Sequence, residues 1–139
     1  MNEEPVYDQE VAMALRGKEF MNAEPLCNAE VMDLLKTRAD TLGAARITVP
    51  SMIRDTLKDL SKVAKVTNAT VDLSVIQKQK TNLESIECDG DGKTLRLDPV
   101  EVCQILNLAP EDEDELKSYM PTLKRFEDYQ LSLLPDALK

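Results

Sequence analysis

Histidine is absent from the 139 residues of this chain. It is the side chain that most often serves as a general base near neutral pH, and it is the commonest ligand of transition metals. A serine or cysteine nucleophile would also lack its usual activating partner. No Gly-rich phosphate loop is present either. We therefore expect a protein that binds rather than catalyses, with no catalytic residues, no cofactor and no metal site.

Tryptophan is also absent, and aromatic residues make up only 4% of the chain. Leu, Val, Ile and Met must therefore fill the interior, and a chain of this length can bury about one core. No apolar run approaches the roughly 20 residues of a membrane span. The acidic start from Met1 to Pro5 is unlike a secretory signal. We expect a soluble protein that is not exported.

Cysteine occurs three times, at Cys27, Cys88 and Cys103. The odd number and the lack of a C-x-x-C pair argue against a disulfide framework and against a zinc site. The pattern indicates reduced thiols in an intracellular compartment. Cys103 falls within an apolar helical pattern, so we expect it to lie in the core rather than to be reactive.

Basic residues are in deficit, since 17 Lys and Arg face 26 Asp and Glu and leave a net charge of −9. Such a balance repels phosphate and anionic lipid. The mild basic stripe of Lys58, Lys62 and Lys65 is interrupted by Asp55 and Asp59. It also lacks an aromatic side chain on which a base could stack. We expect any nucleic-acid contact to be made mainly through a partner.

Apolar residues recur at helical spacing through most of the chain, which predicts a mostly α fold. Residues 1–28 show no sustained period and are expected to form an extended arm. Asn28 is expected to cap a helix over 29–42, which Gly43 ends. The other expected elements are a linker over 44–50, a helix from 51 to about 66, a helix from Asn68 or Thr70 to about 86, a helix from 99 to about 107, a short helix from Pro110 stopped by Met120 and Pro121, and a last amphipathic piece over 126–134.

The clearest local signal is the start of the helix at residue 99. Asp98 stands at the cap, Pro99 at the first helical position, and Glu101 three residues after the cap. This is the pattern of a capping box.

The acidic run 111–115 could bind magnesium or a basic partner. The helix dipole and water are enough to stabilise these acids, so we favour a solvated first helical turn without a ligand.

The segment 87–92 begins like a calcium loop of the EF-hand type, with acids at alternate positions followed by glycine. With Gly92 at the sixth loop position, however, Glu87 stands where Asp is expected, Thr94 at the apolar position, and Asp98 where the bidentate Glu belongs. Asp98 is also required as a helix cap. We favour a solvated acidic turn over 87–96, and a calcium-binding adaptor is kept as an alternative from another class.

Several segments together carry a family resemblance. They are Leu97 to Pro110, Glu115, Met120 to Leu123, Lys18 to Phe20, Leu26 to Val31 with Leu34 and Leu35, and Thr56 to Asn68. At these separations the chain resembles the fourth subunit of eukaryotic RNA polymerase II, a stalk-subunit family shared with the RNA polymerase III counterpart and the archaeal F subunit. The chain departs from the family pattern in two places. One is the acidic turn at 87–96, and the other is a short Lys124-Arg125-Phe126 where a longer Arg-containing stretch is expected.

The resemblance implies a non-catalytic stalk subunit of a nuclear RNA polymerase that forms an obligate heterodimer with an OB-fold stalk partner and supports initiation. It implies a flexible tail over 1–17, a partner-docking segment over 18–50, and a helical bundle over 51–139 similar to the helicase-and-RNase-D C-terminal domain. The expected partner-facing residues are Phe20, Leu26, Val31, Leu34 and Leu35, and the expected structural residues are Asp98, Pro99, Glu101, Leu106, Leu108, Pro121 and Leu123.

Two other assignments remain open beside it. The RNA polymerase III counterpart belongs to the same class and differs in the large subunits that would co-purify. A free nucleic-acid module of the helicase-associated type would show affinity that falls steeply with salt, and the acidic balance argues against it.

Overall fold

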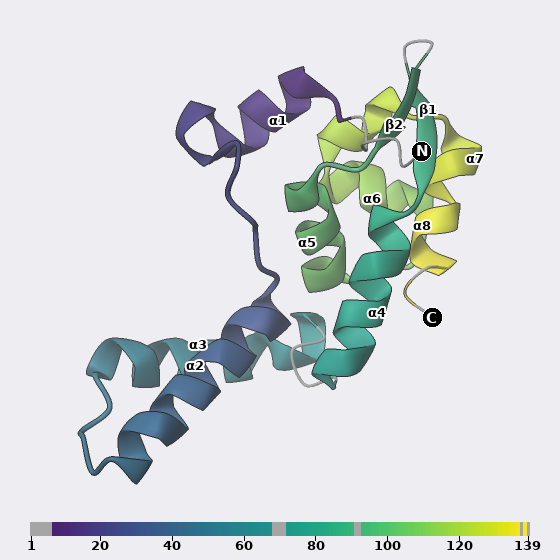
Figure 1. The fold of residues 1–139 in the computed structure, drawn as a ribbon. Coiled ribbons are helices and arrows are strands. Elements are labelled where there is room, and N and C mark those ends of the chain that lie inside the picture. Colours follow the sequence, from purple (N-terminus) through teal and green to yellow (C-terminus); the bar gives the residue numbers. More distant parts are fainter. Residues whose placement is uncertain (1–6, 68–71, 91–92, 137, 139) are drawn as a thin grey trace.

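The computed structural model describes residues 7–67, 72–90, 93–136 and 138, and they form a mostly helical protein (Figure 1). The predicted fold class is thereby confirmed. The elements in chain order are α1 (Gln9–Arg16), η1 (Lys18–Phe20), α2 (Asn28–Ala44), α3 (Ser51–Thr67), α4 (Leu73–Glu84), β1 (Glu87–Gly90), β2 (Lys93–Arg96), α5 (Pro99–Leu108), α6 (Glu113–Tyr119), η2 (Pro121–Arg125), α7 (Asp128–Leu131) and α8 (Leu133–Asp136).

The elements from α4 to α8 form a bundle around one aliphatic core. Ile105 of α5 and Leu116 of α6 are fully buried there, and Leu134 of α8 closes the core from the C-terminal side. Phe126 is the one aromatic side chain among the buried core residues that the structure describes. The core therefore has the aliphatic composition that the scarcity of aromatics predicts.

Helix α5 begins as its sequence predicts. The Asp98 carboxylate accepts a hydrogen bond from the Val100 amide at 3.1 Å, and the Asp98 amide donates to the Glu101 carboxylate at 2.9 Å. These bonds satisfy amides that the first helical turn would otherwise leave without partners. The helix ends at Ala109, whose positive φ of 46° is a left-handed C-cap, directly before Pro110.

Helices α2 and α3, together called the helix pair, pack against each other and extend away from the bundle (Figure 1). Met32 of α2 is buried against Leu57 and Leu60 of α3. The two predicted helices are confirmed, with one correction at each end of α2. Cys27 rather than Asn28 is the N-cap, and Gly43 does not end the helix, which continues to Ala44.

Helix α1 contradicts the extended arm expected over residues 1–28. Asp8 caps it by accepting hydrogen bonds from the amides of Glu10 and Val11 at 3.0 and 3.2 Å. The apolar patch over 11–15 is too short to predict a helix by its period. Ion pairs with residues far along the sequence stabilise it instead, as described below. The structure does not describe residues 1–6 of the expected tail.

The segment 87–96, expected to be an acidic turn, instead contains the two paired strands of an antiparallel hairpin, β1 and β2. Glu87 of β1 pairs with Arg96 of β2, and Gly90 pairs with Lys93. The centre of the calcium-loop pattern, Asp91 and Gly92, lies outside the described residues. Among the residues that are described, no group of three or more acidic or cysteine side chains could hold a metal ion.

Two helix starts differ from the sequence expectation. Helix α4 is capped by Asp72, whereas the expected caps Asn68 and Thr70 lie outside the described residues. Helix α6 begins at Glu113 rather than at Pro110, because the Asp112 carboxylate accepts the Glu115 amide at 2.9 Å. No helix within the described ranges is long and apolar enough to cross a membrane.

Candidate partner interface

Three of the five side chains expected to face a partner are solvent-exposed. Phe20 is 60% exposed at the end of η1, Leu26 is 40% exposed just before α2, and Leu34 is 56% exposed on α2. Val31 and Leu35 are half-buried, and Val31 lies on the same side of the helix as Leu34, three residues away. Leu34 is therefore left in water on a helix that projects from the bundle.

The helix pair exposes further large apolar side chains that sequence reasoning missed. Ile47 in the connection is 55% exposed, and Met52 and Val63 of α3 are 78% and 42% exposed. The signal was present in the sequence, because Met52 and Val63 fall outside the stripe of Ile53, Leu57 and Leu60 that makes α3 amphipathic. A residue off that stripe cannot pack against α2 and is left on the outside.

The first turn of α2 is tied to the bundle by polar contacts. The Glu30 carboxylate accepts the Cys27 amide at 3.1 Å and pairs with the Lys80 ammonium of α4, also at 3.1 Å. The Asn28 amide donates to the Asn107 side-chain oxygen of α5 at 2.7 Å. The base of the helix pair is therefore fixed relative to the bundle, while its exposed leucine lies farther along α2.

These contacts set the protonation of Glu30. Desolvation acts to raise the pKa of Glu30, but hydrogen bonds from the Cys27 amide and Lys80 outweigh it and lower the pKa. Burial likewise acts to lower the pKa of Lys80, and the Glu30 carboxylate outweighs that effect and raises it. Both side chains are thus held in their charged forms.

We expect Glu30→Gln to lower the free energy of unfolding by about 1–2 kcal/mol at pH 7, because a charge-assisted hydrogen bond is lost. The pKa of Glu30 lies below 4.5 in the folded chain, so its stabilisation is complete above that value. It is lost as the pH falls through the folded pKa. Urea titrations between pH 3 and 7 measure the free energy of unfolding of the unaltered chain and of Glu30→Gln. The two free energies should become equal at the acid end of this range. Lys80→Met should show the same convergence, and a difference that is constant with pH would contradict this account.

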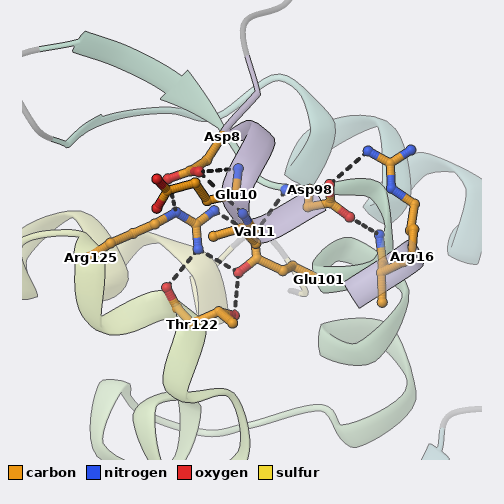
Figure 2. A network of polar contacts seen from close by, with 9 residues as sticks. Asp8, Glu10, Val11, Arg16, Asp98, Glu101, Thr122 and Arg125 are labelled. Carbon is orange, nitrogen blue, oxygen red and sulfur yellow. Dashed lines mark hydrogen bonds and ion pairs between the residues drawn. The ribbon is translucent and has the colours of Figure 1, made fainter. Parts of the chain in front are cut away.

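The polar network at the start of α5 ties three segments of the bundle together (Figure 2). Glu101 is fully buried. Each of its carboxylate oxygens accepts a hydrogen bond of 2.7 Å from one of the two terminal nitrogens of Arg125. The Thr122 hydroxyl donates to the same carboxylate at 2.7 Å. Such bidentate pairs are among the strongest hydrogen-bonded arrangements in proteins. Arg125 was not singled out by the sequence, although it lies in the Arg-containing segment that the resemblance indicated.

The expected structural residues lie in the bundle and at the ends of its helices. Leu106 and Leu123 are buried in the bundle, and Pro121 starts η2 just after Met120 ends α6. Leu108 is 38% exposed at the last position of α5. It directly precedes the left-handed cap at Ala109, and its role in holding the bundle together stays a prediction.

The sequence of this chain matches a known family model. The model described as RNA polymerase Rpb4 matches residues 25–139, from the linker before α2 to the end of the bundle. The chain belongs to the RNA polymerase Rpb4 family. It is therefore an RNA polymerase stalk subunit. The DNA-directed RNA polymerase II subunit rpb4 of Dictyostelium discoideum is 26% identical to it over 127 residues, which cover 87% of this chain and 81% of the relative.

The Rpb4 match includes the whole helix pair and the bundle. It begins at Pro25, so α1 and η1 precede it. Leu26, Val31, Leu34 and Leu35 lie within the matched region, whereas Phe20 lies outside it. Leu34, the exposed leucine of α2, thus lies in the region that the family model matches.

Two buried thiols of this Rpb4-family chain lie where α2 meets α5. The Cys103 thiol donates to the Pro25 carbonyl at 3.4 Å, and desolvation raises the pKa of Cys103 to about 12. Desolvation also raises the pKa of the buried Cys27. Neither thiol has the exposure or the lowered pKa of a reactive cysteine. The expectation that Cys103 is a core residue is confirmed.

We expect both thiols to resist alkylation in the folded chain. A pKa of about 12 in place of 9 lowers the thiolate population of Cys103 by about a thousandfold at pH 8. The measurement is iodoacetamide labelling of a Cys88→Ser variant, followed by mass spectrometry, in buffer and in urea. Labelling of Cys103 at equal rates in the two conditions would contradict its burial.

Proposed function

We propose that this chain is the stalk subunit of a nuclear RNA polymerase II. In this proposal it forms an obligate heterodimer with an OB-fold stalk partner, supports transcription initiation, and carries no catalytic residues of its own. The name of the Dictyostelium relative, a subunit of RNA polymerase II, supports the choice of polymerase. The equivalent subunit of RNA polymerase III remains the second candidate within the same family.

The exposed apolar side chains of the helix pair carry the heterodimer part of the proposal. Leu34, Met52 and Ile47 are each more than half exposed on a part of the chain that projects from its own bundle. Large apolar side chains left in water are typical of surfaces that another protein covers. The base of α2 is held by Glu30 and Lys80, so this surface is presented in a fixed orientation and needs little ordering on binding.

The charge of the chain supports a role beside, rather than on, the nucleic acid. A net charge of −9 disfavours direct contact with phosphate. The acids of α6 are also engaged by the chain itself, since the Glu115 carboxylate accepts the Glu111 amide at 2.9 Å. An OB-fold partner supplies the nucleic-acid contact in this proposal, because OB-folds bind single strands through basic grooves and aromatic platforms.

Affinity purification of the tagged full chain from its own cells tests the proposal. We expect the large subunits of RNA polymerase II and one OB-fold subunit to co-purify in equal amounts. Recovery of the RNA polymerase III large subunits would replace the first candidate by the second. Recovery of the chain without any polymerase subunit would overturn the proposed function.

A further inference from the structure

Helix α1 is tied to the bundle at both of its ends by ion pairs (Figure 2). At its start, the Asp8 carboxylate lies 3.8 Å from the Arg125 guanidinium. At its end, the Arg16 guanidinium pairs with the buried Asp98 carboxylate at 2.9 Å and donates to the Met21 carbonyl at 2.6 Å. The two ion pairs join the first helix to residues more than 80 positions away in the sequence.

The apolar contribution to this attachment is small. Ala12 is the one buried residue of α1, and the described residues of the main core cluster begin only at Cys27. Met13 is 50% exposed. Val11 and Leu15 are only half-buried, and an alanine side chain buries little apolar surface, so hydrophobic burial stabilises the docked helix less than it stabilises the elements of the bundle.

Two open pockets, each with a volume of about 260 Å³, lie beside Arg16, between the end of α1, the linker that follows η1, and the bundle. Leu15, Phe20 and Val100 line one of them, and Arg16, Lys80 and Glu84 line the other. Both pockets are open to solvent, so the side chains that line them are not enclosed by protein as those around Ile105 are.

The connection to the rest of the chain allows α1 to move independently. An extended linker leads from η1 to α2 (Figure 1). The base of α2 has its own attachments to the bundle, through Glu30 with Lys80 and through Asn28 with Asn107. Release of α1 would break none of these contacts.

We propose that α1 is an electrostatic strap. Residues 8–16 dock across the start of α5 through the Asp8–Arg125 and Arg16–Asp98 ion pairs, and they detach as a unit while the bundle stays folded. Detachment uncovers Val100 and the edge of the Glu101–Arg125 pair, and it frees the half-buried Leu15. Ionic strength acts on this equilibrium mainly through the Asp8–Arg125 pair, which is the more exposed of the two, because salt screens a nearly buried pair such as Arg16–Asp98 only weakly. This inference does not depend on the polymerase assignment.

Hydrogen exchange of the full chain, read by mass spectrometry on peptides from α1 and α5, tests the strap. Asp8→Asn removes the charge and keeps a side-chain oxygen to cap the helix, and we expect α1 amides to exchange about fivefold faster in this variant. Raising the salt from 50 mM to 500 mM should act in the same direction on the unaltered chain. The α5 amides should keep their protection in both cases.

Glu10→Gln is the matched control, since it removes an exposed negative charge from the same turn of α1. It should leave the exchange of α1 within about twofold of the unaltered chain. Unchanged protection of α1 in Asp8→Asn and at high salt would overturn the proposal. Equal acceleration of α1 and α5 would also overturn it, because the two helices would then open as one unit.

Discussion

Glu101→Gln should lower the free energy of unfolding by about 3 kcal/mol, a large part of the roughly 5–15 kcal/mol that a domain possesses. The substitution keeps the size of the side chain but removes its charge. The Arg125 side chain is only 12% exposed. Its guanidinium would lose its bidentate partner. Asp8, at 3.8 Å from Arg125, is too far away to replace it. Urea unfolding followed by circular dichroism measures the loss.

A double-mutant cycle separates this interaction from a general effect of substitution. Arg125→Met alone should be similarly destabilising, because it leaves the Glu101 charge buried beside only the Asp98 amide and the Thr122 hydroxyl. The double variant should be more stable than the sum of the two losses predicts, by at least about 1 kcal/mol. Asp114→Asn, at an exposed acid of α6, should change stability by less than about 0.5 kcal/mol. Strict additivity would show that the two side chains do not act as a pair.

Leu34→Asp should weaken binding of the OB-fold stalk partner by about a hundredfold and leave the chain folded. Leu34 is 56% exposed in the free chain, so the core loses nothing when it is replaced. In the proposed heterodimer the new carboxylate would be buried against apolar atoms, and losses of 2–4 kcal/mol are typical for a central interface residue. Isothermal titration with the purified partner gives the dissociation constants, and circular dichroism reports the folding of each variant.

Thr37→Asp provides the control for Leu34→Asp. It adds the same charge to another exposed position of α2, one turn away. Its effect on binding should be no more than about fivefold, because the substitution replaces a small polar side chain and removes no large apolar contact. Equal loss of affinity in both variants would show that added charge, rather than the loss of an apolar contact, disturbs binding. Unchanged affinity in Leu34→Asp would remove this leucine from the interface.

Local sequence signals predict the helices whose stability is local. Helix α5 has its capping box at Asp98 and Glu101, and α3 has an apolar stripe of the correct period, so both were found with accurate starts. Helix α1 could not be found in this way. It has eight residues and one buried side chain, and it depends on Arg16 meeting Asp98, which is a property of the tertiary structure. The hairpin of β1 and β2 was missed because its residues are typical of a turn and form strands only through pairing with each other.

The partner-facing residues illustrate a second limit of sequence reasoning. The periodicity of α2 identifies Val31, Leu34 and Leu35 as apolar, but it does not say which of them α3 covers. Packing of α3 against Met32 decides this, and it leaves Leu34 on the outside. Arg125 was missed for a related reason. Nothing near it in the sequence indicates that it pairs with a buried glutamate 24 positions earlier.

The central claim is that a second protein covers the exposed apolar side chains of the helix pair. Light scattering of the chain co-expressed with the OB-fold stalk subunit of the same organism tests this claim most directly. We predict a single species with one copy of each protein, in which amides of α2 and α3 gain protection from hydrogen exchange. Two separate monomers, each folded and with the exchange of α2 and α3 unchanged, would contradict the account.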